Sequence, residues 1–198
     1  MSTTDTGNNL FPVFFKLEEM NLLIVGGGYV GWEKLSVVIN NSPKTKIKLV
    51  AKEMGQEVID LAMEYPNITL LEKAFEESDL EGINLVIVGI NDPDASSSIQ
   101  LICRQKNILV NVADKPSLCD FYLGSVVKKG DLKIAISTNG KSPTVAKRMR
   151  ELLTDVIPDT IDEVLQNMTE IRDKLKGDFD YKVNKLNEIT KSWKNGKG

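Results

Sequence analysis

Short, largely apolar runs alternate with helix-like stretches through residues 20–112, and this alternation limits the fold more than any other feature. We expect strands at residues 20–25, 47–51, 68–71, 85–90 and 108–112. We expect helices at residues 29–40, 56–64 and 92–106. Continuous apolar runs of this length are typical of strands buried on both faces. Strands alternating with helices require crossover connections, which produce a parallel sheet covered by helices. The predicted fold of residues 1–113 is therefore α/β, a Rossmann-like doubly wound parallel sheet.

The alternation ends after Asp114. Two apolar runs, 121–127 and 132–137, are joined by a polar turn and predict a small antiparallel β pair. A two-stranded sheet is marginal alone, so we interpret residues 114–145 as a dimerisation segment that pairs with a second copy. We expect a C-terminal helical domain at 146–198, with helices predicted at 144–156, 157–175 and 179–193. The polar residues 1–9 and the tail 194–198 are predicted to be disordered or frayed.

The first apolar run ends in a glycine-rich loop that opens a helix. Its GxGxxG pattern consists of Gly26, Gly28 and Gly31. In this strand–loop–helix context the pattern indicates dinucleotide binding: the first glycine permits the turn, the second admits a pyrophosphate, and the third allows close helix–strand packing. The phosphates would meet the amide groups at the helix N-terminus. We predict cofactor contacts from this loop, including its intervening residues Tyr29 and Val30.

Two further strand ends bear on the cofactor. Lys52 and Glu53 follow the second strand, where an acidic residue would bind ribose hydroxyls and a basic one a 2′-phosphate. Both side chains could also be simply solvated, so the residues alone leave NAD and NADP open. Gly89 and Asn91 close the fourth strand, where the crevice of such a sheet holds its ligand, and we predict cofactor contacts there.

The chain contains no histidine among its 198 residues. This excludes Ser-His-Asp and Cys-His nucleophile systems and imidazole metal ligands. Proton transfer must then use Asp, Glu, Lys, Tyr or Cys. Asp114 directly follows the fifth strand, at the edge where a doubly wound sheet places its chemistry, so it is the candidate acid or base. The alternative is a turn residue ahead of Lys115-Pro116.

Charge and cysteine content point to a cytoplasmic protein with a small-molecule ligand. The net charge of −3 gives no reason to expect a nucleic-acid or membrane partner. No signal-peptide pattern or apolar run of membrane length is visible. Cys103 and Cys119 lack metal-site spacing, so we interpret them as reduced structural thiols and predict no metal site. Residues 128–150 nevertheless contain seven basic residues and one acid, a segment suited either to a polycarboxylate ligand or to solvent.

Four segments in order resemble the siroheme-synthase family of precorrin-2 dehydrogenases, some of which are also sirohydrochlorin ferrochelatases. Phe11–Phe15 resembles the family's "PIF" strand, and Gly26–Lys34 (GGGYVGWEK) resembles its GGGxVAxRK loop. Asn111–Asp114 resembles its NVxD segment, and Ser137–Pro143 (STNGKSP) its dimerisation signature. The match covers about residues 11–155. Gly31 departs from the family's usual Ala, a change that we expect to be harmless.

The resemblance implies an oxidoreductase that takes precorrin-2 to sirohydrochlorin with NAD as the hydride acceptor. It implies an intertwined homodimer, and in bifunctional members Fe²⁺ is a further substrate. Carried over, Asp114 is the catalytic carboxylate and Asn111 a substrate contact. We also predict substrate contacts from the dimerisation signature and the basic segment, at Ser137, Lys141, Ser142 and Arg148. Two alternatives stay open: another Rossmann oxidoreductase acting on an anionic substrate, and a non-enzymatic dinucleotide-sensing domain.

Overall fold

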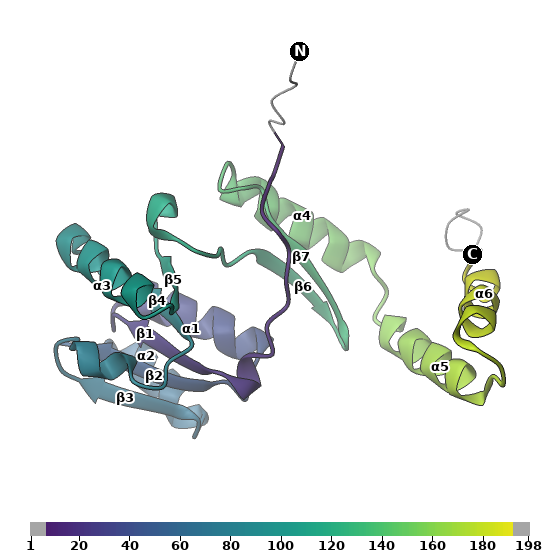
Figure 1. The fold of residues 1–198 in the computed structure, drawn as a ribbon, viewed down its shortest axis with the longest axis horizontal. Coiled ribbons are helices and arrows are strands. Elements are labelled where there is room, and N and C mark those ends of the chain that lie inside the picture. Colours follow the sequence, from purple (N-terminus) through teal and green to yellow (C-terminus); the bar gives the residue numbers. More distant parts are fainter. Residues whose placement is uncertain (1–6, 192–198) are drawn as a thin grey trace, which may run out of the picture. The chain divides into compact units, whose positions relative to one another are not determined.

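The computed structural model describes residues 7–191 and divides the chain into two compact units (Figure 1). Unit 1 comprises Met1–Leu123 and unit 2 Gly124–Gly198. Each unit is described by itself. The residues predicted to be disordered or frayed at 1–6 and 194–198 lie outside the described part, as do the last two residues of the helix predicted at 179–193.

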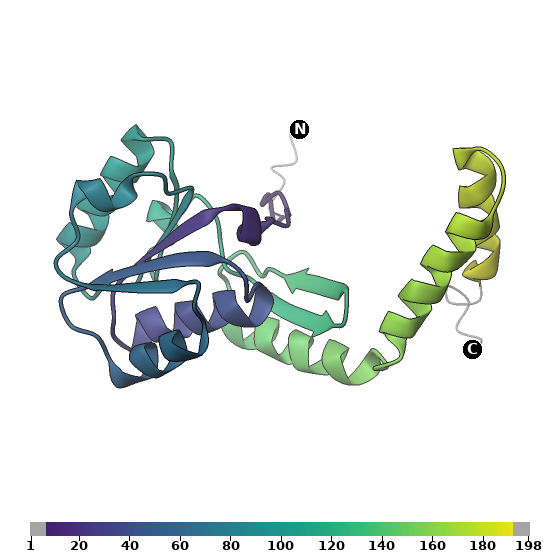
Figure 2. The same ribbon diagram turned by 90° about the horizontal axis from the view of Figure 1, so that it is seen from below.

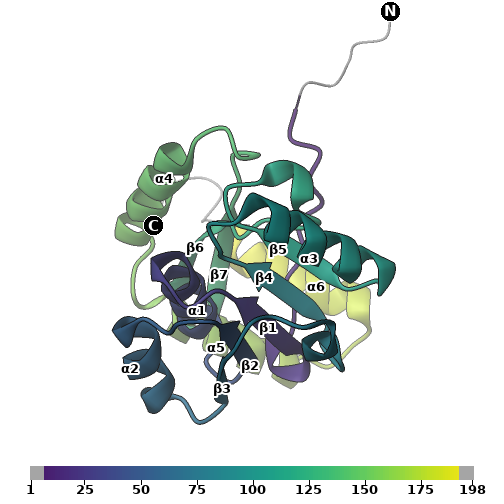
Figure 3. The same ribbon diagram turned by 90° about the vertical axis from the view of Figure 1, so that its left-hand side faces the viewer.

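Unit 1 is built on a five-stranded, wholly parallel sheet in the order β3-β2-β1-β4-β5 (Figure 3). Its strands are β1 (Asn21–Val25), β2 (Lys46–Ala51), β3 (Ile68–Glu72), β4 (Leu85–Val88) and β5 (Leu109–Val112). Its helices are α1 (Tyr29–Asn41), α2 (Gln56–Glu64) and α3 (Pro93–Gln105), with short 3₁₀ turns η1 (Leu17–Glu19), η2 (Glu77–Leu80) and η3 (Pro116–Leu118). The predicted Rossmann-like fold class is confirmed.

The apolar strands are buried on both faces because helices cover each side of the sheet. In Figure 2 the sheet separates α1 and α2 from α3. Alternate residues of β1 serve the two cores: Leu22 and Ile24 pack with α1 and α2, whereas Leu23 and Val25 pack on the side of α3. The carboxyl ends of all five strands meet at one edge, because every pairing is parallel. That edge carries most of the predicted site.

Several boundaries differ from expectation. The strand predicted at 121–127 spans Ser125–Lys129, and the helix predicted at 157–175 spans Ile161–Lys174. Three larger differences concern unit 1. Residues 11–15, expected to form a strand, have no regular structure, and Phe11 is 87% exposed. Pro12 lacks an amide hydrogen for pairing, and Phe15 instead places its ring edge-on to Phe121. The fourth strand ends at Val88 rather than at residue 90. Unit 1 extends to Leu123 rather than to residue 113, because residues 119–121 turn back along β5.

Unit 2 consists of a β-hairpin and three helices. They are β6 (Ser125–Lys129), β7 (Leu132–Ile136), α4 (Pro143–Val156), α5 (Ile161–Lys174) and α6 (Phe179–Ile189). The two strands pair antiparallel through a turn at Gly130, whose φ of 54° lies in the left-handed region. The start of α5 is fixed to this turn: the amide of Asp131 donates to Asp162 Oδ1 at 2.8 Å, and Lys129 pairs with Asp159. Among residues 7–191, no helix combines the length and hydropathy that crossing a bilayer requires.

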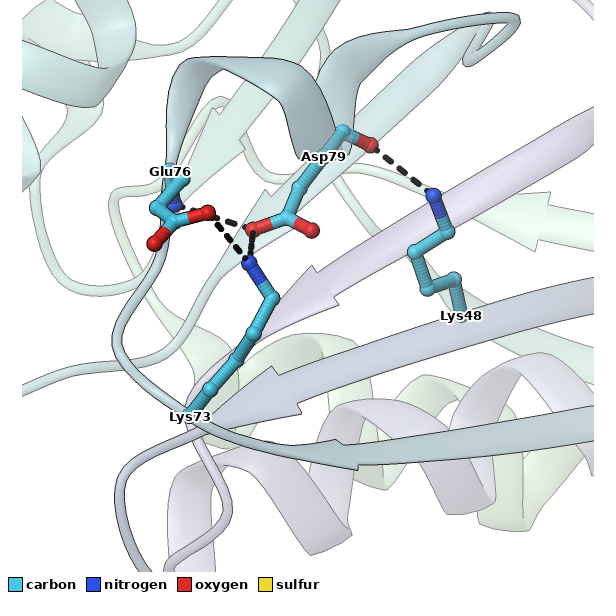
Figure 4. Close-up of polar contacts among 4 residues, drawn as sticks. All are labelled: Lys48, Lys73, Glu76 and Asp79. Carbon is cyan, nitrogen blue, oxygen red and sulfur yellow. Dashed lines mark hydrogen bonds and ion pairs between the residues drawn. The ribbon is translucent and has the colours of Figure 1, made fainter.

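A polar cluster in unit 1 holds η2 over the sheet face next to α3 (Figure 4). Asp79 is buried, and its Oδ2 accepts from the Lys73 ammonium and from the amide of Glu76, each at 2.9 Å. Lys48, from β2, donates to the backbone carbonyl of Asp79 at 3.3 Å. Burial raises the pKa of Asp79, but the Glu76 amide and Lys73 outweigh it, so its pKa lies below the ordinary 3.8. Ionised Asp79 therefore stabilises unit 1.

Replacing Asp79 with Asn should lower the free energy of unfolding at neutral pH by about 1 kcal/mol, because half-exposed Lys73 loses a charged partner. A carboxyl with a lowered folded pKa stabilises the fold above its unfolded pKa, and this stabilisation disappears as pH falls below 3.8. The difference between wild type and Asp79→Asn should therefore shrink in urea unfolding at about pH 3. Exposed Glu81→Gln is the control. An unchanged difference at both pH values would contradict this assignment.

Candidate functional site

The glycine loop lies between β1 and α1, where the strand order reverses from β1-β2-β3 to β1-β4-β5. Ligands of doubly wound sheets bind at this switch point, beyond the carboxyl ends of the strands. Gly26 begins the loop with its amide donating to Val50 of β2 at 2.9 Å. On the side of β4, the amide of Gly89 donates to the carbonyl of Val25, just before the loop, at 2.8 Å. The loop is thus anchored to both neighbouring strands.

Two glycines of the motif are required by the fold itself. Gly26 has a φ of 122°, and a Cβ there would overlap the carbonyl of Gly89. At Gly31, in the first turn of α1, a Cβ would overlap the carbonyl oxygen of Gly26. Close packing of α1 against the loop therefore excludes a side chain at both positions.

Gly28 differs, because nothing in the fold requires a glycine there. Its φ is −84°, and a Cβ at this position would meet no atom within 4 Å. Gly28 is also the N-cap of α1, and no side chain caps this helix. The first amide groups of an α-helix have no intrahelical partner and carry the positive end of the helix dipole. The open space beside Gly28 and the uncapped N-terminus together suit the pyrophosphate of a dinucleotide.

The turn after β2 packs directly on the glycine loop. The amide of Gly55 donates to the carbonyl of Gly27 at 2.8 Å, and a Cβ on Gly27 would overlap the carbonyl of Glu53. This contact brings the exposed residues Lys52 and Glu53 next to the loop, and their contact with the ribose of a bound dinucleotide stays a prediction. Tyr29, 74% exposed, packs its ring against Trp32 at a centroid separation of 5.5 Å.

The end of β4 forms the opposite wall of the loop. A Cβ on Gly89 would lie 3.2 Å from Val30 and 3.3 Å from the amide nitrogen of Gly31, so this glycine is tightly packed rather than open to a ligand. Asn91 is exposed two residues later, ahead of the Asp92 N-cap of α3. Of the two residues predicted at this strand end, Asn91 is therefore the one with an accessible side chain.

Asp114 lies two residues beyond β5, at the same edge of the sheet, and is exposed. Its φ is 58°, in the left-handed region, which costs a residue with a side chain about 1 kcal/mol. The amide of Lys115 donates to the carbonyl of Val112 at 3.2 Å and closes the turn that contains Asp114. An exposed carboxylate in a fixed, unusual backbone conformation can accept or deliver a proton beyond the sheet.

Asn111, for which the resemblance implies a substrate contact, lies in the interior. It is 6% exposed, and its Nδ2 donates to the carbonyl of Phe121 at 2.8 Å and lies 3.5 Å from Cys119 Sγ. The sequence does not indicate that Cys119 and its neighbours contact Asn111. These contacts are made by single side chains, which leave no periodic pattern in the sequence. A direct contact of Asn111 with substrate stays a prediction.

The remaining predicted substrate residues belong to unit 2. Ser137 Oγ accepts from the amide of Asn139 at 3.2 Å, and Ser142 caps α4 by accepting from Val145 at 3.2 Å. Lys141 is exposed. Arg148 pairs with Glu151 at 2.6 Å, which lowers the pKa of Glu151. Their roles toward a substrate stay predictions. Within the described residues, no group of three or more His, Cys, Asp or Glu side chains gathers in a way that could hold a metal ion.

A parallel sheet in this order, with a glycine loop at its switch point and open space beside Gly28, defines a dinucleotide-binding domain. The family model described as "Putative NAD(P)-binding" matches residues 13–125, and the one described as "Sirohaem biosynthesis protein central" matches residues 129–155. The chain belongs to this NAD(P)-binding family of siroheme biosynthesis, the siroheme-synthase N-terminal family.

Individual relatives agree with the family assignment. A siroheme synthase of Psychrobacter sp. (strain PRwf-1) is 33% identical over 168 residues, which cover 85% of this chain and 34% of that protein. The siroheme biosynthesis protein met8 of Schizosaccharomyces pombe is 33% identical over 172 residues, covering 83% of this chain and 62% of that protein. The chain thus spans about a third of the siroheme synthases that it matches. The solved structure of SirC, a precorrin-2 dehydrogenase, shares the fold, with a TM-score of 0.72 and 22% identity over 91% of this chain and 89% of that one.

Proposed function

We propose that this chain dehydrogenates precorrin-2 to sirohydrochlorin with NAD⁺ as the acceptor. The observation that carries the proposal is the glycine loop at the switch point, on the same sheet edge as the exposed Asp114. The met8 relative and the SirC structure, named for siroheme biosynthesis and precorrin-2 dehydrogenation, supply the substrate.

The residues have distinct roles in this proposal. Gly28 leaves room for the pyrophosphate, and the amides that open α1 bind it. Bound NAD⁺ supplies the hydride acceptor. Dehydrogenation removes a hydride and a proton from the substrate, and the Asp114 carboxylate accepts the proton. Because Asp114 is exposed, it can pass that proton on to water.

The test is anaerobic incubation of the protein with precorrin-2 and NAD⁺, followed by absorption spectroscopy. We expect sirohydrochlorin and NADH to appear in equal amounts. Absence of both products would contradict the proposal and favour either a different anionic substrate or a dinucleotide-sensing role. Iron insertion is measured separately, by adding Fe²⁺ to sirohydrochlorin with and without the protein. A rate equal to that of the protein-free control would restrict the activity to dehydrogenation.

We assign ribose recognition to Glu53, whose carbonyl packs on the glycine loop and whose side chain is exposed. Glu53→Ala should raise the Kd for NAD⁺ about tenfold, because a charged hydrogen bond to the ribose hydroxyls is lost. The Kd for NADP⁺ should change little, because its 2′-phosphate would meet Lys52. Isothermal titration calorimetry measures both, with Glu57→Ala of α2 as the control. If Glu53→Ala binds NAD⁺ as tightly as wild type does, another side chain recognises the ribose.

We also propose that the chain forms a homodimer through unit 2. Within this unit, four apolar residues of α4 stay exposed at helical spacing: Val145, Met149, Leu152 and Val156. The adjoining side of α4, with buried Ala146, packs on the hairpin. An exposed apolar stripe of this kind is typical of a helix that contacts a second protein surface. Sedimentation equilibrium should give twice the mass of the chain, whereas a single-chain mass would exclude the dimer.

A further inference from the structure

Strand β5 is an edge strand of the five-stranded sheet. The backbone groups of Asn111 and Ala113 face β4, and the amide of Ala113 donates to the carbonyl of Val88 in β4 at 2.9 Å. The backbone groups of Val110 and Val112 point the other way, where no strand pairs with them. Unpaired edge groups must find other partners, because burying them unsatisfied is unfavourable.

The chain supplies those partners by returning after Asp114. The amide of Asp120 donates to the carbonyl of Val110 at 2.8 Å, and Asp120 Oδ2 accepts from the amide of Val110 at 3.0 Å. One step along β5, Cys119 Sγ accepts from the amide of Val112 at 3.3 Å and donates to its carbonyl at 3.2 Å. Two side chains thus replace the neighbouring strand that β5 lacks.

A third side chain acts from within the strand. Asn111 donates its Nδ2 to the carbonyl of Phe121 at 2.8 Å and also approaches Cys119 Sγ. We call Asn111, Cys119 and Asp120 the edge clasp. All three are tied to backbone groups on either side of residues 113–118, so they close the base of the loop that carries Asp114.

We propose that the edge clasp positions the Asp114 carboxylate for proton transfer, which makes its three members positioning residues. The inference rests on the proposed function, in which Asp114 accepts the proton. A left-handed backbone at a residue with a side chain persists only where the surroundings enforce it. Cys119 reaches this backbone most directly, because its thiol also lies 3.3 Å from the carbonyl of Lys115, the residue after Asp114.

The chemistry of Cys119 fits this role. Burial raises the pKa of its thiol above the ordinary value, so the group stays protonated and can donate at neutral pH. A serine at this position would also donate and accept, over a shorter reach. An alanine could do neither. Cys119→Ser and Cys119→Ala therefore separate the hydrogen bonds of the clasp from the mere filling of space.

The first experiment compares steady-state kinetics of the full chain as wild type, Cys119→Ala, Cys119→Ser and Asn111→Ala. Exposed Ser117→Ala, in the same loop but outside the clasp, is the matched control. We expect Cys119→Ala to lower kcat about tenfold or more, since small displacements of a reacting group are costly. The Kd for NAD⁺ and the KM for precorrin-2 should not change. Cys119→Ser should recover most of the lost kcat.

Asn111→Ala distinguishes positioning from substrate contact. In the clasp it should lower kcat at an unchanged KM, whereas a direct substrate contact would raise KM. The second experiment follows amide hydrogen exchange in wild type and Cys119→Ala without substrate. Faster exchange should be confined to a peptide that contains Val112–Lys115.

The outcomes separate the two proposals. An inactive wild type overturns the proposed function, while the exchange measurement still tests whether the clasp holds the loop. A wild-type kcat in Cys119→Ala, or exchange unchanged at Val112–Lys115, overturns the clasp. A decrease in kcat that Cys119→Ser does not recover assigns Cys119 to packing and likewise overturns it.

Discussion

Asp114→Asn should lower kcat for precorrin-2 dehydrogenation by a factor of about 10² to 10⁴, the usual contribution of a positioned acid or base. Asparagine has nearly the same shape as aspartate and tolerates the left-handed φ of 58° that this position adopts. It cannot accept a proton at neutral pH. The Kd for NAD⁺ and the thermal unfolding midpoint should therefore stay at wild-type values. The steady-state rate of NADH formation, with precorrin-2 and NAD⁺ saturating, is the measurement.

Asp114→Gly provides the control for this substitution. Glycine adopts a left-handed φ without strain, so this variant loses the carboxylate with no backbone penalty. It should be as inactive as Asp114→Asn and at least as stable as wild type. Asp114→Ala is less informative, because alanine adds strain at φ 58° and mixes a folding effect with a catalytic one. Wild-type turnover in Asp114→Asn would show that this carboxylate takes no part in proton transfer.

The sequence predicted the parallel sheet because its signals are local and repeated. Each strand of unit 1 is a short, mostly apolar run. The helices between have clear ends, such as the Asp92 cap of α3, whose Oδ1 accepts from the amide of Ala95 at 2.9 Å. Residues 11–15 show the limit of the same reasoning. An apolar segment becomes a strand only if another strand pairs with it, and Phe11–Phe15 has no such partner in unit 1.

The candidate site was predicted less completely, because side-chain contacts with backbone groups leave no periodic trace. Asp114 and the glycine motif were found from their places after strands. The buried position of Asn111 was not predicted. The sequence does not show that the fifth strand lies at the edge of the sheet, nor which later residues return along it. Gly31 was expected to allow close helix–strand packing and to be harmless as a departure from the family's alanine. The structure agrees with this expectation, because a Cβ at Gly31 would overlap the Gly26 carbonyl.

Two glycine-to-alanine substitutions in the glycine loop, at Gly31 and Gly28, separate what folding requires from what cofactor binding requires. Gly31→Ala should lower the free energy of unfolding by about 1–3 kcal/mol, as overpacking does when backbone must move. Gly28→Ala should leave it within about 0.5 kcal/mol of wild type, because its methyl group would enter open space at an ordinary φ. Urea unfolding without cofactor measures both.

Cofactor binding should show the opposite order. The methyl group of Gly28→Ala would stand where the pyrophosphate approaches α1, so the Kd for NAD⁺ should rise about tenfold or more. Exposed Gly82→Ala is unsuitable as a control, because its φ of 70° would add strain. Exposed Ser97→Ala on α3 is a better one. Equal NAD⁺ affinity in Gly28→Ala and wild type would show that the pyrophosphate does not bind beside Gly28. A stability loss in Gly28→Ala as large as that in Gly31→Ala would show that the fold, and not the ligand, requires both glycines.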